Sequence, residues 1–258
     1  MTFEAQRRQR VETLARRLQH PDPSQLLFQM AEIAGDQTYL RHGITAGPGD
    51  VVLDVGANVG VAAVFFAVLC GVAQVHCFEP VAPVCAILRE NVAALSACVV
   101  HEHGLGSRPG RVPITYYPGA AAMSGLYADP IRDCALVRAV LINRGLSESE
   151  ADDQLAGRYQ SERLSCEIRT LSGALREHQI EFVDLLKIDV ERAELDVLGG
   201  IEGRDWPRIG QIVMEVHDDD GRGQATADAL VRRGFRVTRD QEDAMHGTSV
   251  EMLYATRP

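Results

Sequence analysis

Residues 51–60 read VVLDVGANVG, an apolar segment that runs directly into two glycines. Its β-branched side chains suit a strand that is covered on both faces, so residues 51–55 are predicted to form a buried parallel strand. Gly56 and Gly60 allow a sharp turn and the close approach of a ligand, and the helix expected from Gly60 presents unpaired N–H groups. We therefore expect an α/β fold with a small-molecule site at this loop.

The spacing of this loop is DxGxxxG, whereas a dinucleotide site has GxGxxG. Asp54 would repel a pyrophosphate, but it suits a ligand with an ammonium group, such as the amino-acid end of S-adenosylmethionine. A second predicted strand, residues 73–78, ends at Glu79, which lies 79 − 54 = 25 positions after Asp54. A ribose-binding acid lies roughly 20 residues along a βαβ nucleotide unit. Asp54 and Glu79 are thus predicted to bracket an adenosyl ligand, the alternative being an ordinary βαβ unit whose acids bind nothing.

Length and charge exclude several classes of protein. A chain of 258 residues suits one large α/β domain. The net charge of −10 lacks the basic footprint of nucleic-acid binding. No apolar run reaches the ~18 residues of a membrane span, and the Arg-rich N-terminus has no signal-peptide core. We expect a cytoplasmic protein that binds neither nucleic acid nor membrane.

Cysteine and histidine spacing does not indicate a structural metal site. The six cysteines are scattered without a CxxC pair, so we expect neither a zinc site nor a disulfide framework. His101 and His103 are interpreted as residues at a strand end and not as ligands.

The chain is predicted to contain an extension, one domain and an insertion. Residues 1–23 read as an amphipathic, Arg-rich helix that is either a solvated flank or a docking surface, for example in a homodimer. Residues 24–258 form the single domain. Residues 111–166 interrupt the βα alternation with a strand, a small-residue loop and two helices near 130–145 and 148–160. We expect this insertion to be a lid that shapes an acceptor pocket, with a purely structural excursion as the alternative.

Several polar side chains are expected at the carboxyl edge of the sheet, where open α/β folds bind ligands. The loop after the third strand contains His103, Gly104 and Leu105, which we place near an adenine. Asp189 follows the fourth core strand, residues 183–188, and His217 ends the fifth. Upstream of the first strand, Tyr39 is expected to stack on a ligand and His42 to donate to it, although an ordinary turn explains them equally well. The last two strands, near 235–238 and 250–255, are predicted to pair as a hairpin.

Six sequence blocks together resemble the FkbM family of S-adenosylmethionine-dependent methyltransferases. They are VLDVGANVG, FEP at 78–80, LLKIDVERAE at 185–194, MEVHD at 214–218, and the pair YLRHG at 39–43 and MSGLYAD at 123–129. The last pair is similar to the branch that acts on macrolide polyketide hydroxyls. The resemblance implies a Rossmann-like seven-stranded sheet of order 3-2-1-4-5-7-6, with only the last strand antiparallel. It also implies O-methylation of a natural product or a sugar in secondary metabolism.

One position departs from the family pattern. Arg192 stands where the family commonly has glycine in DVEGxE, and we expect it to touch the acceptor, as we do for Met123, Ser124 and His42. The residues predicted to hold the cofactor are Tyr39, Asp54, Gly56, Ala57, Asn58, Gly60, Glu79, Pro80, His103, Gly104, Leu105 and Asp189.

Methyl transfer to a hydroxyl needs close positioning and removal of a proton. His217 is the first candidate base because histidine titrates near neutrality. Glu215 shares its strand face, and Asp189, Glu191 and Glu215 are predicted to orient the imidazole or the acceptor. Two alternatives stay open: proximity alone, or a Mg²⁺ ion held by Asp189, Glu215 and Asp218.

Rival functions also remain at this stage. A nicotinamide oxidoreductase is disfavoured by DxGxxxG, and a non-catalytic adaptor is disfavoured by the presence of both acids and His217. The acceptor is expected to be a polyketide or macrolide-like natural product, free or bound to a carrier, with a sugar or peptide-linked hydroxyl as the alternative.

Overall fold

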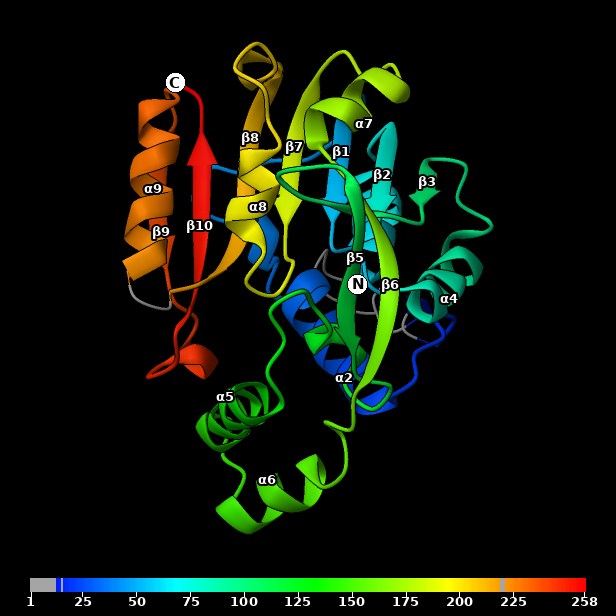
Figure 1. Ribbon diagram of the computed structural model, residues 1–258, viewed down its shortest axis with the longest axis vertical. Helices are drawn as coiled ribbons and strands as arrows, with labels where there is room; N and C mark the ends of the chain where they lie inside the picture. The colour runs from blue at the N-terminus through cyan, green and yellow to red at the C-terminus, as the bar shows by residue number, and fades with distance from the viewer. Residues whose placement is uncertain (1–12, 15, 219–220) are drawn as a thin grey trace, which may run out of the picture.

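The computed structural model describes residues 13–14, 16–218 and 221–258. Its centre is a seven-stranded sheet of order β3-β2-β1-β7-β8-β10-β9, in which β10 runs antiparallel to both of its neighbours (Figure 1). Counted along the chain, these strands have the order 3-2-1-4-5-7-6, so the predicted fold is confirmed. The strands are β1 (Val51–Val55), β2 (Gln74–Phe78), β3 (Cys98–His101), β7 (Val183–Ile188), β8 (Ile209–His217), β9 (Arg236–Asp240) and β10 (Val250–Thr256).

The insertion contains a small sheet of its own, which the sequence analysis did not anticipate. Strands β4 (Gly104–Leu105), β5 (Gly110–Tyr116) and β6 (Glu162–Arg169) pair in the order β4-β6-β5. Helices α5 (Pro130–Asn143) and α6 (Glu148–Leu155) follow β5 and lie below the main sheet in Figure 1. The two predicted helices are confirmed, although the second ends five residues early.

Helices cover both faces of the main sheet. The remaining α-helices are α2 (Pro23–Gln29), α3 (Val61–Val64), α4 (Ala82–Val92), α7 (Leu171–Glu177), α8 (Glu194–Gly199) and α9 (Arg222–Arg232). Short 3-10 or π segments are η1 (Met30–Gly35), η2 (Thr38–Leu40), η3 (Phe65–Cys70), η4 (Ala121–Met123), η5 (Trp206–Arg208) and η7 (Asp243–Met245). Among the described helices, none combines the length and apolarity needed to cross a membrane.

Strand alternation divides the core into two clusters. Val52 packs with α3 and α4 on one face, whereas its neighbour Leu53 packs with α7 and α8 on the other. This is the pattern of a parallel sheet buried on both sides. Asp54 lies on the same face as Val52, which places it on the side of the sheet that carries Tyr39.

The predicted N-terminal helix falls mostly on residues 1–12 and 15, which lie outside the described residues. Of the described part, Leu14 and Leu18 pack against the core. The division into an extension and one domain, and any dimer contact there, stay predictions.

A buried ion pair ties the insertion to the main sheet. The Asp133 side chain of α5 is fully buried and accepts from Arg192 Nη1 at 2.6 Å and from the Tyr117 hydroxyl at 3.0 Å. Arg192 follows β7 and has a φ of +74°, in the left-handed region that favours glycine. The ion pair between Arg192 and Asp133 holds α5 in place, and its favourable energy offsets the backbone strain at Arg192.

We predict that Asp133→Ala destabilises the fold by about 3–5 kcal/mol, because it leaves the Arg192 guanidinium buried without its carboxylate. Chemical unfolding of the variant measures this change. Asp152→Ala is the matched control, since Asp152 pairs with Arg138 at the surface of the same lid. Equal stability of the two variants would contradict the anchoring role.

Candidate active site

The candidate site lies where the strand order of the sheet reverses, at the carboxyl ends of β1 and β7. These strands pair directly, while β2 and β3 continue on the other side of β1, so this is the switch point at which open α/β folds bind ligands. Gly56 has a φ of +79°, and a Cβ there would lie 1.7 Å from the carbonyl oxygen of Asp189. Only glycine fits this contact between the loop and the end of β7.

A lysine that the sequence analysis overlooked occupies the switch point. Lys187 Nζ lies 2.9 Å from Asp54 and 3.6 Å from Asp189, and it donates to the Gly56 carbonyl at 2.8 Å. Burial lowers the pKa of Lys187, but Asp54 and Asp189 outweigh it and raise the pKa to about 12. The sequence does contain a signal for this residue: Lys187 interrupts the apolar run LLKI, and a buried charge needs a partner of opposite charge nearby.

Asp54, which was predicted to bind the ligand directly, pairs with Lys187 in the interior instead. Its side chain is 0% exposed and lines neither of the two cavities described below. The carboxylate is buried within the sheet, where it neutralises Lys187. Asp54 therefore supports the loop from beneath and does not face the ligand.

The larger cavity has a volume of about 290 Å³, and residues of the predicted lid form part of its lining. Its polar floor carries Tyr39, Asp189, Glu215 and His217, and the Tyr39 hydroxyl donates to Asp189 at 3.2 Å. Its walls are mostly apolar: Phe28, Ile33, Val61, Met123, Leu136, Val137, Val140, Leu141 and Met245. Met123 thus lies where an acceptor residue was expected, and so do the helices of the predicted lid.

The smaller cavity, of about 70 Å³, lies on the β2 side of the glycine loop. Glu79 lines it and accepts from the backbone N–H groups of Asn58 and Val81 at 3.0 and 2.9 Å. Burial raises the pKa of Glu79 to about 7 although these bonds oppose the shift. Among the other predicted residues, Pro80, Gly104, Leu105 and Ser124 line this cavity and not the larger one.

The two cavities meet at a shared wall. Gly56, Asn58, Ala122, Asp189 and Glu191 line both of them. A ligand that fills the smaller cavity therefore faces a second ligand in the larger one across these residues. This geometry suits the transfer of a group between two bound molecules.

Three carboxylates gather at this junction. One oxygen each from Asp189, Glu191 and Glu215 lies within 4.8 Å of the others. Beside them, His217 Nε2 is 3.3 Å from Glu191 and Nδ1 is 3.6 Å from Glu194. The sequence analysis missed Glu194, which belongs to α8 and approaches only through the turn after β7.

His217 is a cation in this setting. Burial lowers the pKa of His217, but Glu191 and Glu194 outweigh it and raise the pKa to about 11. A protonated imidazole has no lone pair to accept a proton at neutral pH. The structure therefore argues against the predicted role of His217 as the general base.

Three further residues that were predicted to contact a ligand line neither cavity. His42 instead binds Asp240 at 2.8 Å and packs on Tyr254. The Arg192 guanidinium donates a hydrogen bond to the Asp133 carboxylate at 2.6 Å.

The ring of His103 packs against that of Phe78 with centroids 5.4 Å apart, and the next two residues, Gly104 and Leu105, line the smaller cavity.

Two other predicted residues also lie elsewhere. Gly60 lines neither cavity but begins α3, where its φ of +93° and its contact with Leu88 require glycine. Asp218 accepts from Arg239 at 3.2 Å and from the Gly223 N–H at 2.9 Å, so it is not part of the carboxylate group. The third carboxylate beside Asp189 and Glu215 is that of Glu191.

Glu32 of η1 is another acid that the sequence analysis missed. It lines the larger cavity, and burial, with Glu242 and Asp189 nearby, raises the pKa of Glu32 to about 8. Nothing in its local sequence indicates this position, because η1 reaches the cavity only through packing against α3 and η3.

A Rossmann-like sheet with a cleft and an adjoining larger cavity at its switch point is an architecture compatible with a methyltransferase. Comparison with known proteins agrees: residues 54–237 match the model of the methyltransferase FkbM domain. The chain is 37% identical over 240 residues to 31-O-demethyl-FK506 methyltransferase FkbM of Streptomyces tacrolimicus, covering 92% of each chain. The protein belongs to the FkbM methyltransferase family.

Two more relatives were found. AMB antimetabolite synthetase AmbE of Pseudomonas aeruginosa is 38% identical over 88% of this chain, which spans only 11% of that protein. The crystal structure of methyltransferase FkbM from Methylobacillus flagellatus superposes with a TM-score of 0.51 at 12% identity. That match covers 95% of this chain and 57% of the other, and it supports the fold.

We predict that His217 stays an imidazolium from pH 6 to pH 8, because Glu191 and Glu194 hold its proton. Nitrogen chemical shifts of the labelled ring distinguish the cation from the neutral tautomers. A neutral ring at pH 8 would contradict the ion-pair geometry.

The same ion pairs predict how stability depends on pH. The folded-state pKa of His217, about 11, lies above the unfolded value of 6.5. Its stabilisation is therefore fully present below about pH 6.5 and is lost as the pH rises toward 11. We expect the difference in unfolding free energy between the native protein and His217→Gln to shrink over this range in urea titrations, and a constant difference would refute the linkage.

Proposed function

We propose that the protein is an S-adenosylmethionine-dependent O-methyltransferase that acts on a hydroxyl of a polyketide or macrolide-like natural product. The observation that carries this proposal is the meeting of a small cleft and a large apolar cavity at Gly56, Asn58, Asp189 and Glu191. The cofactor would occupy the small cleft and the acceptor the large cavity. The reacting atoms would then meet at the shared wall.

The residues of the small cleft fit S-adenosylmethionine, which supplies an activated methyl group. Glu79 offers carboxylate oxygens for the ribose hydroxyls, and Leu105 and Ile168 offer an apolar surface for the adenine. Asn58 Oδ1 is buried without a hydrogen-bond partner at the junction of the two cavities, so it suits the ammonium group in place of Asp54. Asn58 has a φ of +47°, a conformation that asparagine tolerates better than most residues.

The acceptor class follows from the lid. Apolar side chains of α5, from Leu136 to Leu141, and Phe28 of α2 face a cavity far larger than a water site. The name of the Streptomyces relative refers to FK506, which supports a bulky natural-product acceptor. A sugar or peptide-linked hydroxyl remains the alternative, and a carrier-bound acceptor is compatible with the open side of the cavity.

A carboxylate of the junction is the proposed base. Burial, together with Asp189 and Glu191, raises the pKa of Glu215 well above its usual value, which brings it closer to the range in which a carboxylate accepts a proton effectively. His217 would then act by positioning Glu191. In the sequence analysis His217 was the base and Glu215 an orienting residue, whereas in this assignment Glu215 is the base and His217 orients an acid.

A divalent metal is the second candidate for the proton step. Asp189, Glu191 and Glu215 offer oxygen ligands of the kind that Mg²⁺ prefers. A bound Mg²⁺ ion would lower the pKa of the acceptor hydroxyl as a Lewis acid.

We expect one molecule of S-adenosylmethionine to bind per chain in a calorimetric titration, and Glu79→Ala to weaken binding by about 1.5–3 kcal/mol, the range for a hydrogen bond to a charged group. Glu102→Ala is the control, because Glu102 is exposed and pairs only with Arg89. Equal affinity of both variants would sink the ribose assignment. Binding of NAD(H) in place of S-adenosylmethionine would sink the proposed function.

For the chemical step we expect Glu215→Gln to slow methyl transfer by about 10²–10⁴-fold, the range for general base catalysis, while cofactor affinity stays unchanged. The assay is mass spectrometry of macrolide acceptors that lack one O-methyl group. Loss of wild-type activity on chelation, restored by Mg²⁺, would favour the metal over the carboxylate base. A fully active Glu215→Gln would exclude Glu215 from either role.

A further inference from the structure

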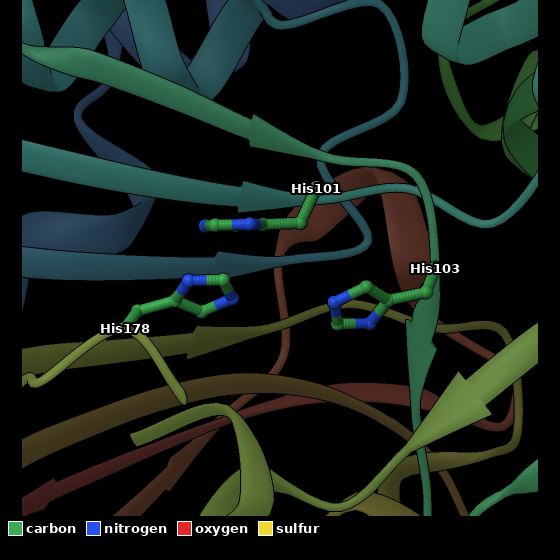
Figure 2. Close-up of side chains that lie close together, drawn as sticks. All are labelled: His101, His103 and His178. Carbon is green, nitrogen blue, oxygen red and sulfur yellow. The ribbon is translucent and has the colours of Figure 1, made fainter. Parts of the chain in front are cut away.

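Three histidines from separate segments meet outside the site described above. His101 ends β3, His103 precedes β4, and His178 follows α7. One ring nitrogen of each lies within 4.8 Å of the others. Figure 2 shows the three rings around one space, with the ring of His101 above those of His103 and His178.

Two of the ring nitrogens are buried without a hydrogen-bond partner. They are Nε2 of His103 and Nε2 of His178. An unpaired buried nitrogen is costly, so this arrangement calls for a ligand that the two nitrogens can share.

The hydrogen bonds around the cluster leave lone pairs facing inward. His103 Nδ1 lies 3.3 Å from the Gly104 carbonyl and donates to it, so the lone pair of this ring resides on Nε2. His101 pairs through Nε2 with His76 Nδ1 at 3.0 Å, and in the tautomer in which Nε2 donates this bond the lone pair of His101 resides on Nδ1. Metal-binding histidines carry outer partners of this kind, which fix the ring and its tautomer.

Burial favours the neutral form of two of the three rings, His101 and His103. Burial, with the neighbouring histidines, lowers the pKa of His101 to about 3, and burial lowers the pKa of His103. Neutral imidazole is the form that binds a metal. The nearby guanidinium of Arg169 is paired with Glu167 at 2.8 Å and with Glu177, so it does not leave the region positively charged.

We propose that His101, His103 and His178 bind one divalent transition-metal ion of the Zn²⁺ class. Three imidazole nitrogens favour Zn²⁺, Co²⁺ or Ni²⁺ over Mg²⁺ and Ca²⁺, which prefer oxygen. Zn–N bonds of roughly 2 Å place ligand nitrogens roughly 3.3 Å apart. The three nitrogens lie within 4.8 Å of one another, and the ring centroids of His101 and His178 are 4.1 Å apart, so binding requires these rings to turn toward the ion. His178 is partly exposed, which leaves water access for a fourth ligand.

The site has a structural consequence for the cofactor cleft. The ion joins the edge strand β3 to the turn after α7, and it sits next to Gly104 and Leu105, which line the smaller cavity. Because these segments are far apart in sequence, the link stabilises the folded chain and this wall of the cleft.

The test is a titration of chelator-treated full-length protein with Co²⁺ and Zn²⁺. We expect one Co²⁺ per chain with visible absorption typical of nitrogen ligands, displacement by Zn²⁺, and a rise in melting temperature with Zn²⁺ but not with Mg²⁺. His178→Ala should weaken binding by at least about 10-fold, and His103→Asn should do the same. His246→Ala, which removes an exposed histidine outside the cluster, is the matched control.

The carboxylates of the catalytic junction are a competing site, and Glu215→Gln separates the two. Zn²⁺ binding that survives Glu215→Gln and is lost in His178→Ala supports the histidine site. Binding that is lost in Glu215→Gln but kept in both histidine variants overturns it. Absence of any binding by the native protein also overturns it, with circular dichroism showing that each variant is folded.

Discussion

The buried pair of Lys187 and Asp54 is the interaction on which the site depends. It joins β1 to β7 at the switch point, and the same ammonium group binds the Gly56 carbonyl and approaches Asp189. A buried charge without its partner costs several kcal/mol, so the strands, the glycine loop and the acid after β7 are held in one arrangement. Both cavities open on that arrangement, which explains why they share a wall.

Charge at this wall is balanced by contacts between distant segments. His217 on β8 lies between Glu191 and Glu194, which flank the turn after β7. The resulting imidazolium neutralises part of the carboxylate group, while Asp189 and Glu215 still face the larger cavity. An acidic junction of this kind suits a cationic cofactor or a divalent ion, and it is poorly suited to a phosphate-bearing dinucleotide.

Arg192 has an unfavourable local backbone conformation, yet its side chain stabilises the tertiary structure. Arg192 occupies a left-handed position where glycine is favoured, yet its side chain binds Asp133 of α5 in the interior. That ion pair fixes a helix whose apolar face lines the larger cavity. A residue that resembled a substrate contact in the sequence therefore holds one wall of this cavity in place.

The sequence by itself determined the sheet, its strand order through the family resemblance, the glycine loop and the two helices of the insertion, because apolar periodicity and turn residues are local signals. It also indicated Glu79, since a strand end and its offset are readable along the chain. Only the tertiary structure decided which polar groups face the cavities. Asp54 pairs with Lys187 and lines neither cavity, whereas Lys187 lines the larger one. Glu191, and not Asp218, joins Asp189 and Glu215 in the carboxylate group. The positive charge of His217 is stabilised by Glu191 and Glu194 on another segment. These outcomes depend on burial and on partners brought together by folding, which no local pattern encodes.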